Sequence, residues 1–519
     1  MAPAEPRDGL GYERDGVRVE PDDEYNRQLV ANVHPAGWVN PEPRDRYHLV
    51  VIGAGTAGLV TAAIAAGLGA RVALVERHLM GGDCLNVGCV PSKGLISAAR
   101  SWQAAADSQR RFGGPAVHGP GDFGAAMAHM RRLRAGISRV DGAARYRELG
   151  VDVFLGAGRF VAGDRVAVDG QSLRFRRAVI ATGARAAEPP IPGLASCGFL
   201  TNETVFTLTE LPRRLLVIGA GPVGCELAQA FARFGSEVVL VAKGAQVLPR
   251  EDADAAAVVE TAMAAQGVRV MHEAQVVRAE RRGADRVLVI ELDGRTEELS
   301  ADQVLVAVGR APNVEGLGLE TAGVAYGPRG VSVNDRLRTS NPRVFAVGDI
   351  CSRYRFTHAA DAQARLVVAN ALFFGLGGGR ASRLVVPWTT YTSPEVAHVG
   401  QCERDAVAAG HQVQTITVPL HDVDRAVLDG QDEGFLRVHL ERGTDRILGA
   451  TLVADHAGEM IGEIVLAITR DIGLAGIGAT IHPYPTRSEV FRKAADAWRR
   501  TKLTPSARRV FRTFFRYVK

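Results

Sequence analysis

Residues 48–77 read HLVVIGAGTAGLVTAAIAAGLGARVALVER: an apolar run, three spaced glycines, a helix-like stretch and a second apolar run. Residues 214–243, RLLVIGAGPVGCELAQAFARFGSEVVLVAK, repeat the frame. A single G-x-G-x-x-G is a weak signal, but a complete strand–helix–strand frame that occurs twice predicts two dinucleotide-binding units. We therefore expect an α/β fold that contains two such units.

Each glycine of the two triplets has a physical role. The first permits a tight turn, the second lets the backbone approach a pyrophosphate, and the third allows a helix to pack closely on a strand. The pyrophosphate then lies at a helix N-terminus, where free N–H groups and the helix dipole favour an anion. These positions are Gly53, Gly55 and Gly58 in the first unit, and Gly219, Gly221 and Gly224 in the second.

The end of the second apolar run distinguishes the two expected nucleotides. In the first unit this run ends at Glu76, where a carboxylate can hydrogen-bond a ribose 2′-hydroxyl. The same offset in the second unit reaches Ala242, followed by Lys243, and a cation without an acid suits a 2′-phosphate. We assign the first unit to the adenosine half of FAD and the second to NADPH. A solvated surface role for Lys243 is the alternative.

Two of the six cysteines lie close together in GGDCLNVGCVPSK, residues 81–93. Six cysteines in 519 residues do not form a disulfide framework, so the pair Cys84 and Cys89 is more typical of catalysis or metal binding. No second Cys or His pair at zinc-site spacing accompanies it. A thiolate at a helix start near Lys93 has a pKa below the usual value of about 8.5.

This stretch resembles the redox-disulfide motif of the class I pyridine nucleotide–disulfide oxidoreductases, the family of lipoamide dehydrogenase, glutathione reductase and mercuric reductase. The resemblance extends over most of the chain. It includes ATG at 181–183, VLVAVGRAPN at 304–313, TSNPRVFAVGD at 339–349 and PWTTYTSPEVAHVG at 387–400. It implies two Rossmann-like domains, for FAD and NAD(P), and a C-terminal α+β dimerisation domain. The expected division is an N-terminal arm (1–46), a FAD-binding domain (47–205), an NAD(P)H-binding domain (206–330), a return segment of the FAD domain (331–383), the dimerisation domain (384–498) and a basic tail (499–519).

The resemblance also implies roles for single residues. Cys89 is expected to face the flavin as the charge-transfer thiolate, and Cys84 to be the interchange thiol that attacks the substrate. Lys93 is expected beside flavin N5, paired with Glu226. Asp349 is expected to bind the FAD ribitol, with a simple turn aspartate as the alternative. Further expected cofactor contacts are Gly82, Ala181, Thr182, Gly183 and Gly309.

The remaining four cysteines are interpreted as small packing residues. They are Cys197, Cys225, Cys351 and Cys402. Because Cys351 lies two residues from Asp349, a redox role for it stays open.

The motif IHPYPTRSE at 481–489 bears on the electron acceptor. Aligned on Pro485, Thr486 and Glu489, it has Tyr484 where the disulfide reductases carry a histidine, and His482 lies two residues earlier. Histidine can shuttle the proton that a released thiolate needs, whereas tyrosine is a poor base at neutral pH. Tyr484 therefore favours a metal ion, a quinone or another electrophile as acceptor. In the alternative, Tyr484 packs at the dimer interface and His482 handles protons.

Mercuric reductase is similar at this position, and LHDVDRAVLDGQDEGFLRV at 420–438 also resembles that subfamily. Two of its hallmarks are missing: no C-x-x-C module precedes the FAD domain, and the tail RTFFRYVK lacks a vicinal cysteine pair. The chain is therefore interpreted as mercuric reductase-like, with no resident metal site.

The two ends differ in charge and pattern. Residues 1–46 are predicted to be a mostly extended arm that contacts the body through Val30, Val33 and Trp38. Residues 498–519 carry eight Lys or Arg and no acid, and without them 54 basic residues face 57 acidic ones. A mildly acidic body argues against nucleic-acid binding. After Pro505 the pattern predicts a basic amphipathic helix, which either meets an anionic membrane surface or packs on protein.

No run of about 18 apolar residues and no signal pattern are present, so we expect a cytoplasmic protein. The resemblance implies a homodimer in which Tyr484 and Glu489 of one subunit complete the other's site. The main hypothesis is electron transfer from NADPH through FAD and the cysteine pair to a small-molecule or metal-ion acceptor. The alternatives are a disulfide reductase or dihydrolipoamide dehydrogenase that uses His482, and a membrane-tethered redox-sensing flavoprotein with low turnover.

Overall fold

The computed structural model describes residues 12–13, 16–17, 19–116, 119, 121–373 and 378–518. Its contacts divide the chain into two compact units, residues 1–245 with 267–384 and residues 246–266 with 385–519. Both predicted nucleotide-binding frames fall in the first unit. Residues 246–266 were expected in the NAD(P)H-binding domain but group with the C-terminal residues.

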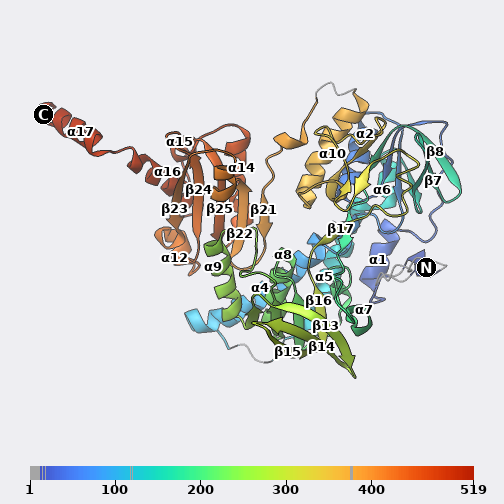
Figure 1. Cartoon of the computed structure of the whole chain (residues 1–519), viewed down its shortest axis with the longest axis horizontal. Helices are drawn as coiled ribbons and strands as arrows, with labels where there is room; N and C mark the ends of the chain where they lie inside the picture. The colour runs from blue at the N-terminus through green and yellow to red at the C-terminus, as the bar shows by residue number, and fades with distance from the viewer. Residues whose placement is uncertain are drawn as a thin grey trace. The chain divides into compact units, whose positions relative to one another are not determined.

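The first frame forms the centre of a seven-stranded sheet (Figure 1). Its parallel strands follow the order β5-β4-β3-β8, and the late strand β20 also pairs with β8 in parallel. Helix α2 (Thr56–Gly67) connects β3 to β4 and packs beside α10 (Thr357–Leu372). The strands are β3 (Tyr47–Ile52), β4 (Val72–Glu76), β5 (Val151–Leu155), β6 (Arg159–Ala162), β7 (Arg165–Val168), β8 (Gln171–Ile180) and β20 (Val344–Ala346).

The burial pattern fits the parallel part of this sheet, whereas β6, β7 and β8 pair antiparallel. Val50 and Ile52 face one apolar cluster, and Leu49 and Val51 face another, and all four side chains are buried. A strand buried on both faces reads as a continuous apolar run, as it does at residues 49–52. The carboxyl ends of the parallel strands therefore meet at one edge, where the nucleotide turn begins.

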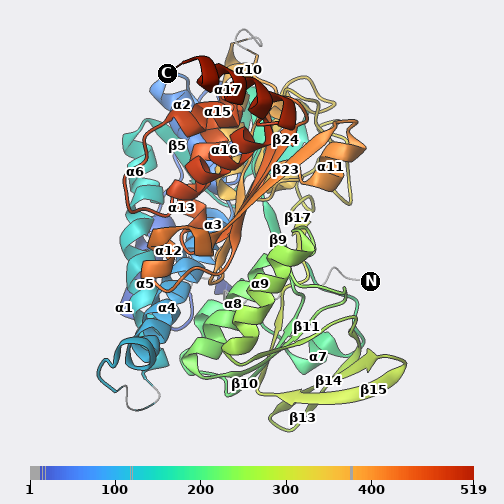
Figure 2. The same cartoon turned by 90° about the vertical axis from the view of Figure 1, so that its left-hand side faces the viewer.

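The second frame forms a four-stranded parallel sheet in the order β12-β11-β10-β16. Helix α8 (Pro222–Phe234) connects β10 to β11. An antiparallel three-stranded sheet, β13-β14-β15, belongs to the same part of the chain (Figure 2). The prediction of two Rossmann-like domains is confirmed. The strands are β10 (Arg214–Ile218), β11 (Glu237–Val241), β12 (Val268–Met271), β13 (Gln275–Arg282), β14 (Asp285–Leu292), β15 (Arg295–Ala301) and β16 (Gln303–Val306).

The N-terminal segment differs from the extended arm that its composition predicted. Asp23 caps a ten-residue helix, α1 (Glu24–Val33), by accepting a 2.8 Å hydrogen bond from the Asn26 amide. Leu29 and Val33 lie one turn apart and are fully buried. The prediction was wrong because two well-spaced apolar residues suffice for a helix that packs on a core, whatever its mean polarity. Residues 34–46 form neither helix nor strand, and the short strands β1 (Tyr12–Glu13) and β2 (Gly16–Val17) precede the helix.

The second unit is built on a five-stranded antiparallel sheet in the order β21-β22-β25-β24-β23. Helix α16 (Glu489–Thr501) packs on it through four buried side chains, Val490, Phe491, Ala494 and Ala495. The strands are β21 (Trp388–Thr390), β22 (Glu395–Gly400), β23 (Val413–Pro419), β24 (Phe435–Glu441) and β25 (Ile447–Ala454).

Helix α9 (Ala253–Ala265) belongs to this unit through polar contacts at its N-terminal end. Trp388 donates a 2.6 Å hydrogen bond to Glu251, and Arg437 forms ion pairs with Asp252 at 3.0 Å and with Asp254. Because such pairings join residues distant in the chain, local sequence patterns gave no sign of them.

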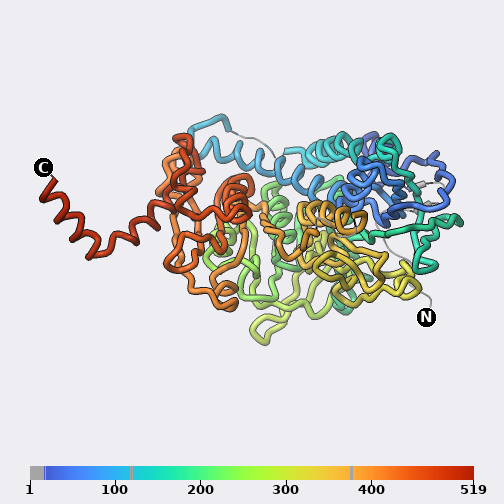
Figure 3. Tube along the Cα trace, turned by 90° about the horizontal axis from the view of Figure 1, so that it is seen from above, coloured from blue at the N-terminus to red at the C-terminus, as the bar shows by residue number. Residues whose placement is uncertain are grey.

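The tail forms the predicted helix, α17 (Pro505–Tyr517), which begins at the cap residue Thr504. It continues past α16 as a separate arm of the C-terminal unit (Figure 3), and none of its side chains is buried. Among the described residues, no helix combines the length and the apolar character that a membrane crossing requires.

Candidate active site

Both nucleotide turns have the same local geometry, which explains their glycines. At Gly53, with φ of +99°, a Cβ atom would lie 2.5 Å from the Ala181 carbonyl oxygen. At Gly219, with φ of +108°, it would lie 2.6 Å from that of Ala307. A Cβ on Gly58 would lie 1.8 Å from the Gly53 oxygen, so the close approach of helix to strand excludes any other residue.

Glu76 ends β4 beside the first turn and is a half-buried carboxylate held by backbone amides. It accepts hydrogen bonds from the Ala54 amide at 2.6 Å and from the His78 amide at 2.9 Å. Burial raises the pKa of Glu76 above its usual value, and the two amide bonds oppose this. A ribose hydroxyl is a fitting further donor for a carboxylate placed here.

The predicted cofactor contacts around ATG are tied to a second segment. Thr182 donates to the Asn313 carbonyl at 3.0 Å, and the Asn313 side chain donates back to the Thr182 carbonyl at 2.9 Å. Gly183 accepts from the Asn313 amide, and Gly309 has φ of +131°. The two quoted motifs therefore form one structural element.

Arg310, which the sequence analysis did not single out, joins two acids of the same region. It pairs with Asp83 of the cysteine loop and lies 3.6 Å from Asp349. Burial raises the pKa of Asp349, and the Arg310 charge opposes that rise. The position of Arg310 inside VLVAVGRAPN was the only sequence signal that pointed to it.

The cysteine loop starts directly against the nucleotide turn. Gly81 pairs with Gly55 in an isolated bridge, and a Cβ on Gly82 would lie 2.6 Å from the Gly55 α-carbon. Cys84 lies in α3 (Gly82–Asn86), and Cys89 is the first residue of α4 (Cys89–Phe112). The glycines thus place the start of the cysteine loop against the first nucleotide turn.

The two thiols have opposite electrostatic environments. A hydrogen bond from Cys84 lowers the pKa of Cys89, and a hydrogen bond from Thr357 and the Lys93 charge lower it further. The same interaction with Cys89, together with burial, raises the pKa of Cys84. The opposite directions of the two pKa shifts are consistent with Cys89 as the thiolate and Cys84 as the thiol, and the roles of the two cysteines in catalysis remain predictions. Thr357 was missed because it lies 268 positions away in the chain.

Lys93 lies one helical turn after Cys89 on α4 and contacts the second frame. Its ammonium is 2.8 Å from the Glu226 carboxylate on α8, and the Glu226 side chain is only 7% exposed. The structure therefore brings this predicted pair together. Its expected place beside the flavin remains a prediction.

The residues named from the 481–489 motif belong to the C-terminal unit. Tyr484 is 70% exposed and donates a 2.8 Å hydrogen bond to Asp424. His482 faces the Glu463 carboxylate through Nε2 at 2.9 Å and the Thr480 carbonyl through Nδ1 at 3.1 Å. Glu489 is buried and pairs with Arg492 at 2.6 Å. Their contribution to a neighbouring subunit's site remains a prediction.

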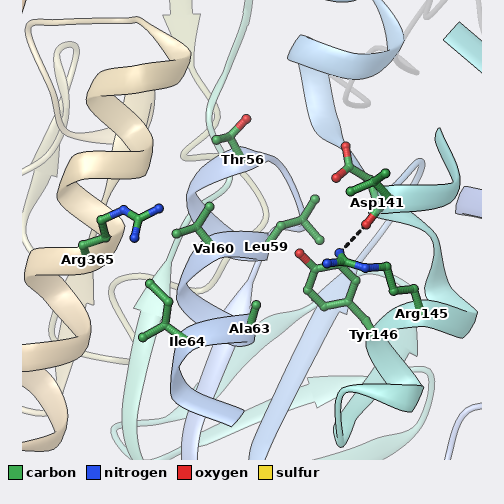
Figure 4. A pocket seen from close by; sticks show the side chains of 10 residues that line it. Thr56, Leu59, Val60, Ala63, Ile64, Asp141, Arg145, Tyr146 and Arg365 are labelled. Carbon is green, nitrogen blue, oxygen red and sulfur yellow. Dashed lines mark hydrogen bonds between the residues drawn. The ribbon is translucent and has the colours of Figure 1, made fainter. Parts of the chain in front are cut away.

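A cavity of about 320 Å³ is lined mainly by side chains of α2 (Figure 4). Leu59, Val60 and Ile64 of α2 form an apolar wall, and Arg365 of α10 lies opposite α6 (Ala143–Glu148). Asp141 lines the same cavity, and its Oδ2 atom lies 3.1 Å from where a Cβ of Gly81 would stand. The cavity therefore ends beside the loop that carries Cys84.

The fold and this site define a class: flavin-dependent oxidoreductases with a nicotinamide site and a redox cysteine pair. Residues 47–364 match the pyridine nucleotide-disulphide oxidoreductase family, and residues 386–495 match its dimerisation domain. The chain belongs to this family. It is an FAD-dependent oxidoreductase that uses FAD and NAD(P)H, and its dimerisation domain supports a homodimer.

The chain is similar to mercuric reductases and to dihydrolipoyl dehydrogenases. The chain is 33% identical to mercuric reductase of Staphylococcus aureus, over 86% of this chain and 82% of that one. It is 35% identical to dihydrolipoyl dehydrogenase of Thermus scotoductus, over 87% and 97%. A structure of the HOCl-induced flavoprotein disulfide reductase RclA of Escherichia coli, a Cu(II) complex, superposes with a TM-score of 0.76 at 28% identity, over 86% of this chain and 98% of that one.

The position of Lys243 leads to a test of nucleotide preference. Ala242 is buried at the end of β11 and Lys243 is exposed beside it. We expect Lys243→Glu to lower kcat/KM for NADPH by about tenfold or more, because a charge-assisted bond to a 2′-phosphate is lost. The value for NADH should fall less than about twofold. Steady-state kinetics with both nucleotides check this. An unchanged kcat/KM for both NADPH and NADH would assign Lys243 to the solvated surface.

Proposed function

We propose that this chain uses NADPH, by way of bound FAD, to reduce the Cys84–Cys89 pair, which then reduces a metal ion or another electrophilic acceptor rather than a disulfide. Gly53, Gly55, Glu76 and Asp349 fit the FAD site, which supplies two-electron transfer between nicotinamide and cysteines. With Hg(II) as acceptor, NADPH and Hg(II) give NADP⁺, Hg(0) and one proton. Unlike the reduction of a disulfide, this step cleaves no S–S bond of the acceptor.

The observation that carries this proposal is the environment of His482 and Tyr484. The His482 side chain is only 6% exposed, and its ring nitrogens contact oxygens of Glu463 and Thr480, so little of the ring is accessible to a substrate. Tyr484 instead presents an exposed ring whose hydroxyl donates to Asp424, an interaction that raises the pKa of Tyr484. A tyrosine with a raised pKa is a hydrogen-bond donor rather than a base at neutral pH.

The cavity beside the cysteine loop is the proposed approach for the acceptor. Its Asp141 end lies beside the Gly81 end of the loop. The hydrogen bond with Cys89 and burial raise the pKa of Cys84, and the negative charge of Asp141 adds to the rise. Because the thiolate is the nucleophile, Cys84 must lose its proton as it attacks a soft metal ion or a quinone-like carbon.

Anaerobic NADPH oxidation by the purified holoenzyme with a panel of acceptors tests the proposal. Thiol-complexed Hg(II), Cu(II), a water-soluble quinone, lipoamide and glutathione disulfide are compared, and Hg(0) is trapped as vapour. We expect turnover with a metal ion or the quinone and at most slow turnover with either disulfide. Rapid disulfide reduction that is lost in His482→Ala would overturn the proposal in favour of the disulfide reductase alternative.

We also propose that the enzyme is cytoplasmic and meets an anionic membrane surface through α17. Five apolar side chains on one face are between 50% and 67% exposed: Val510, Phe511, Phe514, Phe515 and Val518. Four arginines of the same helix are also solvent-facing, and residues 497–519 contain no acid. A basic helix with aromatic apolar residues matches an anionic lipid interface in both charge and polarity. Lys519 lies outside the described residues.

Vesicle binding of the full-length protein checks this role of α17. We expect cosedimentation with phosphatidylglycerol vesicles and little with phosphatidylcholine vesicles. Replacing Arg508, Arg509 and Arg512 by glutamine should weaken binding about a hundredfold at low salt, because each basic side chain contributes about 1 kcal/mol. Phe511→Ser with Phe514→Ser should also release the protein. Equal binding to both vesicle types would contradict an electrostatic docking surface.

A further inference from the structure

Helix α1 packs on α5 (Phe123–Ser138) through a row of polar contacts. The cap residue Asp23 accepts from Arg131 at 2.5 Å, Asn26 accepts from Arg134 at 2.5 Å, and Asn32 donates to Ser138 at 2.9 Å. The family resemblance gave this helix no role. Its contacts therefore raise the question of what the helix does for the site.

Arg134 links α1 to the cysteine loop. The Nη2 atom of Arg134 donates a hydrogen bond to the Asn26 side-chain oxygen. Its Nη1 atom donates a 2.6 Å hydrogen bond to the Asn86 backbone oxygen. Arg134 is 2% exposed, and burial lowers its pKa to about 10, so it remains a cation at neutral pH. A buried guanidinium depends strongly on each acceptor, because an N–H group left without one keeps its full desolvation cost.

Asn86 lies between the two redox cysteines, two residues after Cys84 and three before Cys89. Its side chain donates to the Met80 carbonyl at 3.1 Å and to the Gly82 carbonyl at 2.9 Å, which closes the loop on itself. The Met80 amide in turn donates to the Val33 carbonyl, the last residue of α1. The loop is thus held by α1 at its start directly and at its middle through Arg134.

We propose that α1 is a positioning element for the redox loop, and that Asn26, acting through Arg134, holds the Asn86 carbonyl so that Cys84 stays in register with Cys89. This inference rests on the dithiol role proposed above. Disulfide formation tolerates a narrow range of cysteine geometry, so a small displacement of the Cys84 backbone separates the two sulfurs. Asn26 and Arg134 touch neither cofactor nor acceptor in this scheme.

Three substitutions at two positions of α1 separate positioning from general support of the fold. Asn26→Leu removes the acceptor of Arg134, whereas Asn26→Asp keeps an acceptor oxygen there. Asn32→Leu removes a hydrogen bond between the same two helices that does not lead to the loop. Each variant is purified as the FAD-bound enzyme and reduced anaerobically with two electrons.

Two readouts are then compared: the thiolate-to-flavin charge-transfer absorbance per FAD, and the rate at which iodoacetamide alkylates Cys84. For Asn26→Leu we expect about tenfold faster alkylation of Cys84 and a weaker charge-transfer absorbance. The reason is that Arg134, which holds the Asn86 carbonyl, loses its charge-assisted hydrogen bond to Asn26. Asn26→Asp and Asn32→Leu should match the wild type. Ferricyanide reduction, which takes electrons from the flavin, should be unchanged in all three.

The proposal is overturned if Asn26→Leu behaves as the wild type, if Asn32→Leu is equally perturbed, or if Asn26→Asp fails to restore both readouts. Should Asn26→Leu not yield folded holoenzyme, the double variant Asn26→Leu with Arg134→Met removes donor and acceptor together, and the same tenfold effect is required of it. A wild-type enzyme without charge-transfer absorbance would instead refute the dithiol role in the proposed function, which keeps the two failures distinct.

Discussion

Cys84→Ser is expected to lower kcat for acceptor reduction by about a hundredfold or more, because the interchange thiol can no longer close a disulfide with Cys89. NADPH should still reduce the flavin at close to the wild-type rate, since Lys93 and Glu226 are untouched. Stopped-flow reduction by NADPH and steady-state turnover with the best acceptor measure the two steps separately.

Cys351→Ser is the matched control for this prediction. Cys351 lies two residues after the predicted FAD contact Asp349 in the sequence. Burial raises the pKa of its thiol to about 12, so it stays a thiol at neutral pH. Its sulfur donates to the Gly348 carbonyl at 3.6 Å and has the character of a packing residue. Turnover should therefore be unchanged. Loss of turnover in Cys351→Ser, or its retention in Cys84→Ser, would contradict the assigned pair.

The pH dependence of the charge-transfer absorbance follows from the same geometry. Because the Cys89 pKa is lowered, its thiolate should persist below the usual thiol value of about 8.5 and be lost as the pH falls through the folded-state pKa. The Cys84 hydrogen bond is the largest cause of this lowering. Cys84→Ala removes that bond, so the midpoint should move to higher pH, and Cys84→Ser should move it less.

Features whose causes are local could be predicted from the sequence. The glycine turns, the helix starts at Gly55 and Gly221 and the cysteine pair are all determined within about thirty residues, so their patterns can be read from the chain. The Lys93–Glu226 pair spans 133 positions, and only the family resemblance suggested it.

The features that were missed depend on tertiary packing. Arg310 and Thr357 reach the cysteine loop from distant segments without any local motif that marks them. Helix α1 was misread as extended because mean polarity hid two buried residues, Leu29 and Val33, spaced one turn apart. The hydrogen bond that Arg134 donates to Asn26 of this helix joins residues 108 positions apart and could not be predicted from either segment alone.

Glu226→Gln and Lys93→Met are expected to have large and opposite spectral effects. The Lys93 charge lowers the pKa of Cys89, whereas the Glu226 charge raises it. Glu226→Gln leaves the ammonium without its carboxylate partner, so the charge-transfer midpoint should move to lower pH. Lys93→Met should move it to higher pH. A pH titration of the reduced holoenzymes measures both shifts.

Both substitutions should also slow reduction by NADPH by about tenfold or more, because the pair joins the flavin side to the helix that carries the nicotinamide turn. Breaking a pair whose carboxylate is 7% exposed leaves one charge uncompensated, so the double variant should be less impaired than the two single losses combined. Lys502→Met, an exposed lysine that donates to the Gly443 carbonyl, is the matched control and should change neither readout. Shifts of the same sign in Glu226→Gln and Lys93→Met would show that the two side chains act on Cys89 through structure rather than through charge.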